Sequence, residues 1–169
     1  TVVSGVPTIF AMMLQQRDLL EGRDYSFVRL ATMGGAPATD TLIDAVAETF
    51  PSADIVQIFG ITEASAALFG RHPQRSPRPR HSIGWPIAGN EFRLVGGEDE
   101  NFGTLHVRGP GLMNGYHNNP GEMARRMKDG WFDTGDILRR DPSGWYYFVG
   151  RSDDMFVSSG HNIYPSEVE

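Results

Sequence analysis

The sequence has no cysteine and only one lysine, Lys128. The lack of cysteine excludes disulfides and thiolate metal sites, and it weakly favours a reducing compartment. Positive charge is also scarce, since 15 basic side chains stand against 21 acidic ones and give a formal net charge of -6. A nucleic-acid-binding surface is therefore not expected as the main role.

Long hydrophobic runs and targeting signals are not seen either. Residues 1–16 form the longest early uncharged stretch, which is too short and too polar to span a bilayer. No basic segment precedes an apolar one, so we expect neither a signal peptide nor an integral membrane segment. Thr1 is not an initiator methionine and no helix stop signal precedes Glu169, so we expect a fragment of a larger protein.

Residues 55–63 carry the most informative chemistry. The β-prone run 55–59 leads to Gly60, which can turn the chain sharply, and Thr62 and Glu63 follow at the expected strand end. Ligands of open α/β sheets gather at such ends. A hydroxyl can donate to a phosphate oxygen and a carboxylate can hold Mg²⁺. A strand followed by an N-capped turn is the alternative that these residues alone leave open.

The first half of the chain predicts alternating helices and strands. Helices are expected over 9–20 and over 40–50, the second with Thr39 as its N-cap. Strands are expected over 27–33 and 55–59, which predicts a right-handed parallel crossover. The residues expected to face the core are Ile9, Met12, Met13 and Leu20 in the first helix and Leu42, Ile43, Val46 and Phe50 in the second.

Glycines end the strand predicted over 27–33. Gly34, Gly35 and Ala36 precede Pro37, and such a turn can bring the backbone close to a flat ligand. A plain turn from a strand to a helix is the alternative.

The second half predicts a different architecture. Residues 71–81, rich in arginine and proline, read as a solvated loop, with anion contact or metal binding by His72 and His81 as alternatives. Short strands separated by turns indicate an antiparallel sheet, with a short polar helix over 120–128. The strands are expected over 91–95, 104–107, 131–138 and 145–149, with Trp131, Phe132, Trp145, Tyr146, Tyr147 and Phe148 as the aromatic core.

Five motifs in one order carry a family resemblance. They are Gly34–Pro37, Phe59–Glu63, Gly103–Tyr116 with Pro120, Gly130–Asp136, and Gly150–Asp154 continuing through Gly160 to Glu169. This set resembles the adenylate-forming enzymes, the superfamily of acyl-CoA synthetases, peptide-synthetase adenylation domains and firefly luciferase.

The resemblance implies an α/β fold that is the C-terminal part of the large N-terminal domain of such an enzyme. Parallel strand–helix–strand units would occupy 1–80 as part of the AMP-binding domain. A small antiparallel, β-barrel-like subdomain would occupy 81–150. The hinge and the start of a truncated C-terminal domain would occupy 151–169.

The resemblance also implies a reaction. Members activate a carboxylic acid with Mg-ATP to an acyl-adenylate, and then pass the acyl group to a thiol, usually that of CoA. ATP, Mg²⁺ and CoA are therefore the expected cofactors, and a small carboxylic acid is the expected partner. A cytoplasmic location is expected, while the oligomeric state is left open.

Site residues transfer by motif position. Phe59 would stack on adenine within the segment Gln57, Ile58, Phe59, Gly60 and Ile61, and Gly35, Ala36 and Pro37 would pass along the adenine or the acyl pocket. Thr62 would hydrogen-bond the α-phosphate and Glu63 would bind Mg²⁺. Asp136 and Arg151 would hold the ribose, unless they are an ordinary surface charge pair. Asp153 would be the hinge, and Ser159 and Gly160 would line the CoA tunnel.

Some family features are missing from the sequence. Gly103-Thr104-Leu105 stands where the family often has Gly-Glu-Leu. The family's phosphate loop and C-terminal catalytic lysine are not among these 169 residues, and Lys128 reads as part of a solvated helix face beside Arg125 and Arg126. We therefore expect no adenylation by this fragment alone.

The motifs around 159–169 favour an acyl-CoA synthetase for fatty or aromatic acids. An adenylation domain that loads a carrier protein is one alternative, and a non-catalytic nucleotide-binding module is another. The acid itself is not predicted, since the small residues 64–67 leave both a chain and a ring open.

Overall fold

The computed structural model describes residues 1–154, 156–158 and 161–163. Contacts divide the chain into two compact units, Thr1–Phe59 and Gly60–Glu169, and each is described by itself. This division precedes the boundary predicted at residue 80. The predicted domain limits remain predictions.

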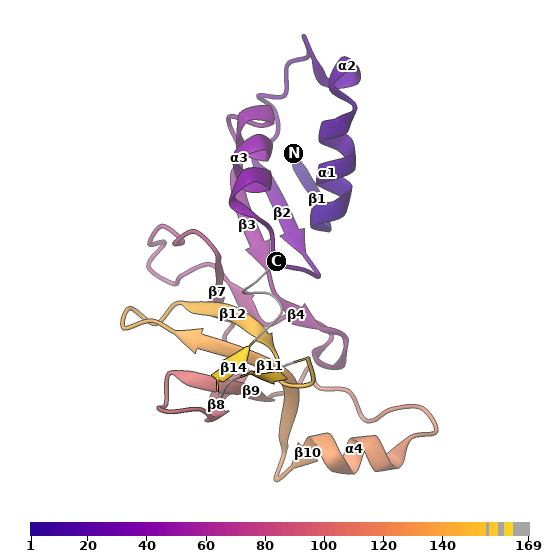
Figure 1. Ribbon diagram of the computed structural model, residues 1–169, viewed down its shortest axis with the longest axis vertical. Coiled ribbons are helices and arrows are strands. Elements are labelled where there is room, and N and C mark those ends of the chain that lie inside the picture. Colours follow the sequence, from indigo (N-terminus) through magenta and orange to yellow (C-terminus); the bar gives the residue numbers. More distant parts are fainter. Residues whose placement is uncertain (155, 159–160, 164–169) are drawn as a thin grey trace. The chain divides into compact units, whose positions relative to one another are not determined.

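The first unit is built on a parallel sheet of three strands in the order β1-β2-β3 (Figure 1). The strands are β1 (Val2–Gly5), β2 (Leu30–Gly34) and β3 (Asp54–Ile58), and the helices are α1 (Pro7–Gln15), α2 (Arg17–Leu20) and α3 (Asp40–Thr49). Because β2 and β3 pair in parallel on either side of α3, the predicted parallel crossover is confirmed.

One face of this sheet carries the core of the unit. Val3, Ala31 and Ile55 lie in register across the three strands, and all belong to or pack against the core cluster. Helix α3 behaves as predicted, because Thr39 Oγ1 accepts a hydrogen bond from the Leu42 N–H at 3.3 Å. Its Val46 is fully buried in the same cluster.

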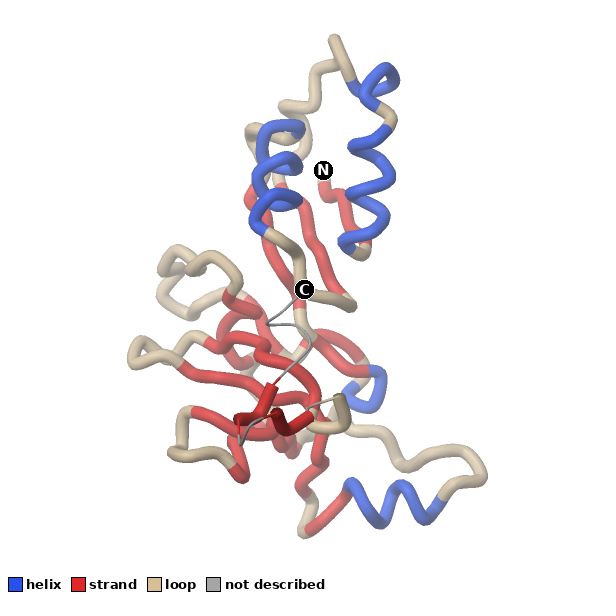
Figure 2. The backbone as a smooth tube through the Cα atoms, viewed as in Figure 1, coloured by secondary structure: helices blue, strands red, loops and turns tan. Residues whose placement is uncertain are grey.

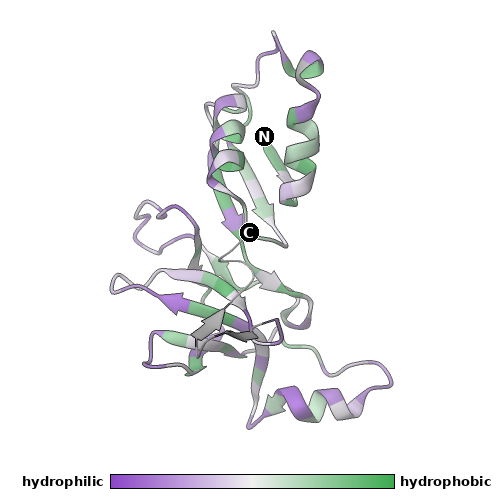
Figure 3. Ribbon diagram, viewed as in Figure 1, coloured by the Kyte–Doolittle hydropathy of each residue, from purple (hydrophilic) through white to green (hydrophobic). Residues whose placement is uncertain are grey.

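Helix α1 differs from the prediction. It starts at Pro7 and ends at Gln15, and a separate short helix follows instead of one helix to residue 20. Ile9 and Met12, expected in the core, are 58% and 65% exposed, while Phe10 is 1% exposed. The helix is hydrophobic along most of its length (Figure 3), so the spacing of its apolar residues alone does not determine which face is buried. Burying the large ring of Phe10 removes the most apolar area from water.

The regular secondary structure of the second unit is mainly strand (Figure 2). Its main sheet follows the order β6-β7-β12-β11-β9-β8 through antiparallel pairs, and β10 pairs with β11. The strands are β6 (Phe69–Gly70), β7 (Ser82–Pro86), β8 (Glu91–Gly96), β9 (Phe102–Arg108), β10 (Met127–Lys128), β11 (Trp131–Arg140) and β12 (Tyr146–Arg151). This confirms the predicted antiparallel architecture.

Four further strands and two helical segments complete the described part of this unit. They are β4 (Gly60–Ile61), η1 (Thr62–Ala64), β5 (Ala66–Ala67), α4 (Pro120–Arg126), β13 (Phe156–Ser158) and β14 (His161–Ile163). Helix α4 is shorter than predicted, since Lys128 lies on β10 and pairs with Trp131.

The aromatic core was predicted only in part. Phe132, Trp145 and Tyr146 are buried. Trp131 lies instead on the opposite face of β11 from Phe132, half-buried, with the guanidinium groups of Arg93 and Arg108 4.2 Å and 4.7 Å from its ring centre. Adjacent residues of a strand point to opposite faces, so a run of aromatics cannot all enter one core.

The arginine-rich loop has neither helix nor strand, as predicted. One of its arginines is structural: Arg78 donates to the carbonyls of Gly70 at 2.6 Å and Ile83 at 3.4 Å. Among the helices of the described residues, none is both long enough and apolar enough to cross a bilayer.

Candidate functional site

The first unit brings two predicted segments together at the carboxyl ends of β2 and β3. Gly34 pairs with Ile58, and a Cβ at Gly34 would lie 2.6 Å from Ile58 Cγ1. Gly35 has φ +84°, a conformation that favours glycine. The Ala38 N–H donates to Gln57 Oε1 at 3.4 Å, which ties the turn to β3.

Three predicted residues of this turn are open to solvent. Gly35, Ala36 and Pro37 are exposed, while Phe59, directly after β3, is half-buried. The turn is thus fixed by the conformation of its glycines and by the Gln57 side chain of β3. Its residues 35–37 are not covered by other residues of this unit.

Thr62 and Glu63 belong to the second unit and occupy a different local structure from the one predicted. Gly60 does not turn the chain but forms strand β4, which pairs with β5 in a hairpin. Thr62 and Glu63 lie in the 3₁₀ turn between these strands, which closes where the Ser65 N–H donates to the Thr62 carbonyl at 3.1 Å with Ser65 at φ 61°. Thr62 is exposed and Glu63 is half-buried.

The segment from Gly111 to Tyr116 holds this hairpin turn in place. The Met113 N–H donates to the Glu63 carbonyl at 2.7 Å, and Ser65 Oγ donates to the Gly111 carbonyl at 2.9 Å. The Tyr116 hydroxyl donates to Glu63 Oε1 at 2.8 Å. Burial, together with this hydrogen bond, raises the pKa of Tyr116 to about 12, so the hydroxyl remains a donor at ordinary pH.

Tyr116 was missed as a site residue by sequence reasoning. It lies within one of the family motifs, but it is 53 positions from Glu63 in the sequence. Its position beside the carboxylate follows only from the folded unit.

Asp136 and Arg151 face one another across neighbouring strands. They are register partners in β11 and β12, and Arg151 Nη1 donates to Asp136 Oδ1 at 2.9 Å. Asp136 is only 5% exposed, so this is not an ordinary surface pair. Its backbone N–H donates to Thr134 Oγ1 at 3.0 Å, and Thr134 in turn donates to the Leu105 carbonyl.

Burial raises the pKa of Asp136, although Arg151 acts against this shift. The negative charge of Glu63 adds to the rise, which places Glu63 within electrostatic range of the Asp136–Arg151 pair. The second unit therefore gathers Glu63, Asp136 and Arg151 from a hairpin turn and two sheet strands.

A chain of alternating charges extends this pair. Arg151 Nη2 and Arg126 Nη2 both donate to Asp153 Oδ2, at 3.4 Å and 3.2 Å. Arg126 Nε also donates to Glu122 Oε1 at 2.9 Å. The side chain of Arg126 is 11% exposed, whereas Lys128, which was predicted on a solvated face, is exposed.

Gly135 lies between the two arginines of this chain. It has φ +74°, and a Cβ there would lie 2.6 Å from Arg126 Nη1 and 3.3 Å from Arg151 Nη2. Ser152 donates to the Gly135 carbonyl through its N–H at 2.8 Å and its hydroxyl at 3.1 Å. These bonds fix the chain immediately before Asp153. Ser159 and Gly160 lie outside the described residues.

The described residues include no group of three or more histidine, cysteine, aspartate or glutamate side chains that could hold a metal. Glu63 offers one carboxylate, which is compatible with Mg²⁺ bound mostly by phosphate and water. The contacts of His72 do not support metal binding by this residue. Its ring lies against Trp85 with ring centres 4.2 Å apart, and its Nδ1 accepts a hydrogen bond from the Gln74 N–H.

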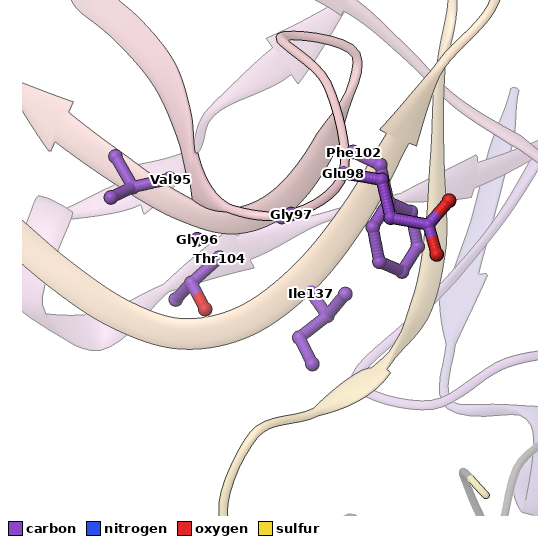
Figure 4. A pocket seen from close by; sticks show the side chains of 8 residues that line it. Val95, Gly96, Gly97, Glu98, Phe102, Thr104 and Ile137 are labelled. Atoms are coloured by element: carbon purple, nitrogen blue, oxygen red, sulfur yellow. The ribbon is translucent and has the colours of Figure 1, made fainter. Parts of the chain in front are cut away.

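The hollows among the described residues of the second unit include the following two. One, of about 310 Å³, contains none of the predicted site residues and is lined by Val95, Gly96, Gly97, Glu98, Phe102, Gly103, Thr104 and Ile137 (Figure 4). The other, of about 490 Å³, has Tyr116 in its lining with residues of α4, namely Pro120, Met123 and Ala124. Of these two, the second adjoins the candidate site.

Several known proteins similar to this chain are CoA ligases. A long-chain-fatty-acid–CoA ligase of Yersinia pestis is 33% identical over 174 residues, which is 100% of this chain and 30% of that protein. A feruloyl-CoA synthase of an Amycolatopsis species is 33% identical over 100% of this chain and 35% of that protein. The chain thus spans about a third of the length of these curated relatives.

Solved structures agree with this likeness. The anthranilate CoA ligase AuaEII in complex with anthranoyl-AMP matches 100% of this chain with a TM-score of 0.85 and 29% identity, over 33% of its own length. The O-succinylbenzoate CoA synthetase of Bacillus subtilis in complex with ATP and magnesium ion matches with a TM-score of 0.80 and 29% identity, over 35% of its length. Residues 1–117 match the AMP-binding enzyme family, and this chain therefore belongs to that family.

Proposed function

We propose that the protein containing this chain is a carboxylate–CoA ligase. It activates a carboxylic acid with Mg-ATP to an acyl-adenylate and then transfers the acyl group to CoA. The main support is that relatives named as CoA ligases, for a fatty acid in one case and an aromatic acid in another, align with the whole chain. A cytoplasmic location, where ATP and CoA are available, is part of the proposal.

The ribose is assigned to Asp136 and Arg151. A carboxylate accepts hydrogen bonds from both ribose hydroxyls, and a guanidinium adds directed donors. The buried Asp136 is suited to this role because its ionised form gains from every new donor. Arg151 is 41% exposed in its side chain, so it can reach a ligand while it keeps its bond to Asp136.

Thr62 is assigned to the α-phosphate and Glu63 to Mg²⁺. The exposed hydroxyl of Thr62 is free to donate to a phosphate oxygen. Glu63 would hold the metal, which when bound supplies neutralisation of phosphate charge. Tyr116 donates to one oxygen of Glu63 and leaves the charge of the carboxylate in place.

The remaining assignments concern adenine, the hinge and CoA. Phe59 is proposed to stack on adenine, a role that needs only an aromatic face. The exposed turn Gly35–Pro37 would pass along the adenine or the acyl pocket. Asp153, two residues after the end of β12, is proposed as a hinge residue, since hinges lie at the ends of elements. Ser159 and Gly160 are proposed for the CoA tunnel.

The test uses the complete protein with a panel of fatty and aromatic acids. Exchange of labelled pyrophosphate into ATP should depend on one class of acid and should be lost in Glu63→Gln. Addition of CoA should then release AMP from the acyl-adenylate as the acyl group passes to the thiol. Acid-dependent exchange that CoA cannot discharge, but a carrier protein can, would favour the alternative of a carrier-loading domain. No exchange with any acid would favour a non-catalytic nucleotide-binding module.

The 169-residue chain is proposed to be inactive by itself. We expect no pyrophosphate exchange above the level of a Glu63→Ala control. Calorimetric titration with a non-hydrolysable acyl-adenylate analogue, beside Asp136→Ala, determines whether the chain still binds nucleotide. Saturable binding that the variant loses would show that these residues suffice for nucleotide binding.

A further inference from the structure

We propose that Arg126 is a positioning residue for nucleotide binding: by pairing with Asp153, it keeps the Arg151 guanidinium directed at Asp136. This inference rests on the proposed role of the Asp136–Arg151 pair in binding ribose. It adds a residue from helix α4 that touches neither Asp136 nor the proposed ligand.

The first observation is competition for one guanidinium. Arg151 donates through Nη1 to Asp136 and through Nη2 to Asp153, so two carboxylates attract the same guanidinium group from different directions. Opposite charges at such distances attract, although solvent screens the Arg151–Asp153 pair in part, since its side chains are 41% and 50% exposed. Asp153 is half-exposed and follows the end of β12, so its carboxylate can move toward whichever cation holds it.

The second observation is that Arg126 supplies the other cation on Asp153. Its Nη2 lies 3.2 Å from the same Oδ2 that Arg151 approaches at 3.4 Å. Because the Asp153 carboxylate is shared between two guanidinium groups, its attraction for Arg151 is weaker. Without Arg126, the whole attraction of Asp153 acts on Arg151 and draws it from Asp136.

The third observation is that Arg126 is held rigidly enough for this task. Its side chain is 11% exposed, its Nε donates to Glu122 Oε1 at 2.9 Å, and its Nη1 donates to the Asp133 carbonyl at 3.5 Å. Pairing with Arg125 and Arg126 lowers the pKa of Glu122 to about 2, so this anchor remains charged at neutral pH. A long side chain fixed at several donors loses little further freedom when it pairs with Asp153.

The neighbouring Arg125 provides a matched control. It also pairs with Glu122, at 2.6 Å, but its side chain is 57% exposed. Arg125→Gln removes the same charge from the same helix without removing the 3.2 Å contact that Arg126 makes with Asp153. Any effect of net charge on the binding of an anionic nucleotide should be similar in the two variants.

The experiment measures, in the complete protein, the affinities for AMP and for 2′,3′-dideoxy-AMP. The ratio of the two affinities reports the ribose contacts. We expect Arg126→Gln to reduce this ratio about tenfold, which corresponds to about 1.4 kcal/mol, while the affinity for the dideoxy nucleotide stays near that of the wild type. Arg125→Gln should leave the ratio unchanged, and Arg126→Lys should restore part of it.

A second variant separates positioning from a purely structural role. Asp153→Asn removes the competing charge, so the double variant Arg126→Gln/Asp153→Asn should recover most of the wild-type ratio. A folding defect from the loss of Arg126 would not be repaired in this way. The affinity for dideoxy-AMP serves as an internal measure of correct folding in every variant.

Asp136→Asn distinguishes failure of the inference from failure of the proposed function. If Asp136→Asn lowers the ratio and Arg126→Gln does not, the positioning role of Arg126 is overturned while the ribose assignment stands. If neither variant lowers the ratio, the ribose assignment fails and the inference fails with it. An equal loss in Arg125→Gln, or no recovery in the double variant, would also overturn the inference.

Discussion

The hydroxyl of Tyr116 donates to Oε1 of Glu63 at 2.8 Å, although the two residues are 53 positions apart in the sequence. The bond joins the turn of the β4–β5 hairpin to the segment before α4. It fixes one oxygen of the carboxylate that we assign to Mg²⁺. The backbone bond from Met113 to the Glu63 carbonyl, at 2.7 Å, adds a second attachment of the same residue.

Tyr116→Phe removes only this hydroxyl. We expect a loss of about 1 kcal/mol in the free energy of unfolding, the usual net value of such a bond, and a several-fold higher Mg²⁺ concentration for half-maximal pyrophosphate exchange in the complete protein. Tyr147→Phe is the matched control, because Tyr147 donates to Asp141 Oδ2 at 2.9 Å in the same unit. Equal changes in Mg²⁺ dependence in both variants would contradict a specific role of Tyr116.

The close approach of Gly34 to Ile58 makes the turn after β2 sensitive to a single methyl group. Gly34→Ala places a Cβ 2.6 Å from Ile58 Cγ1, and we expect it to cost about 1–3 kcal/mol through overpacking. Gly121→Ala meets no atom within 4 Å and lies in α4, so it should be neutral or slightly stabilising. Urea unfolding of both variants provides the measurement. A Gly34→Ala protein as stable as the wild type would show that β3 yields to the added methyl.

The buried face of the first unit can be tested by paired truncations. Val46→Ala removes buried methyl groups from a fully enclosed site, and we expect a loss of about 2 kcal/mol. Met12→Ala, at a residue 65% exposed, should change the free energy of unfolding by no more than about 0.5 kcal/mol. A large loss in Met12→Ala would instead support the periodicity-based prediction that Met12 packs in the core.

The raised pKa of Asp136 predicts a pH dependence with a definite sign. Because burial raises the pKa of this carboxyl in the folded state, the folded protein binds its proton more tightly than the unfolded chain does. The stability that this proton contributes is therefore present at acidic pH and is lost as the pH rises through the pKa of the folded state.

Asp136→Asn abolishes this titration. The free energy of unfolding of the wild type relative to the variant should therefore fall as the pH rises from below the ordinary aspartate pKa toward neutrality. Chemical denaturation at several pH values measures the difference. A relative stability that rises over the same interval would show that Arg151, rather than burial, dominates the environment of Asp136.

Much of the backbone arrangement was accessible from the sequence. Thr39 caps α3 as its hydroxyl and the following apolar spacing indicated, and the turn-rich second half forms antiparallel strands. These features are local, because side-chain spacing and the needs of backbone N–H groups act over a few residues. The Asp136–Arg151 pair was also anticipated, but through a family motif and not through physical reasoning about two distant residues.

Tertiary structure decided which side chains meet. The sequence offered several apolar stripes along α1, and only packing selected Phe10 over Met12 for the core. The contact of Tyr116 with Glu63 and that of Arg126 with Asp153 depend on strand register and on where α4 lies, which no short stretch of sequence specifies. The sequence by itself thus determined the order of elements and the motifs, while the fold determined the partners, because the register of the intervening strands sets which distant residues meet.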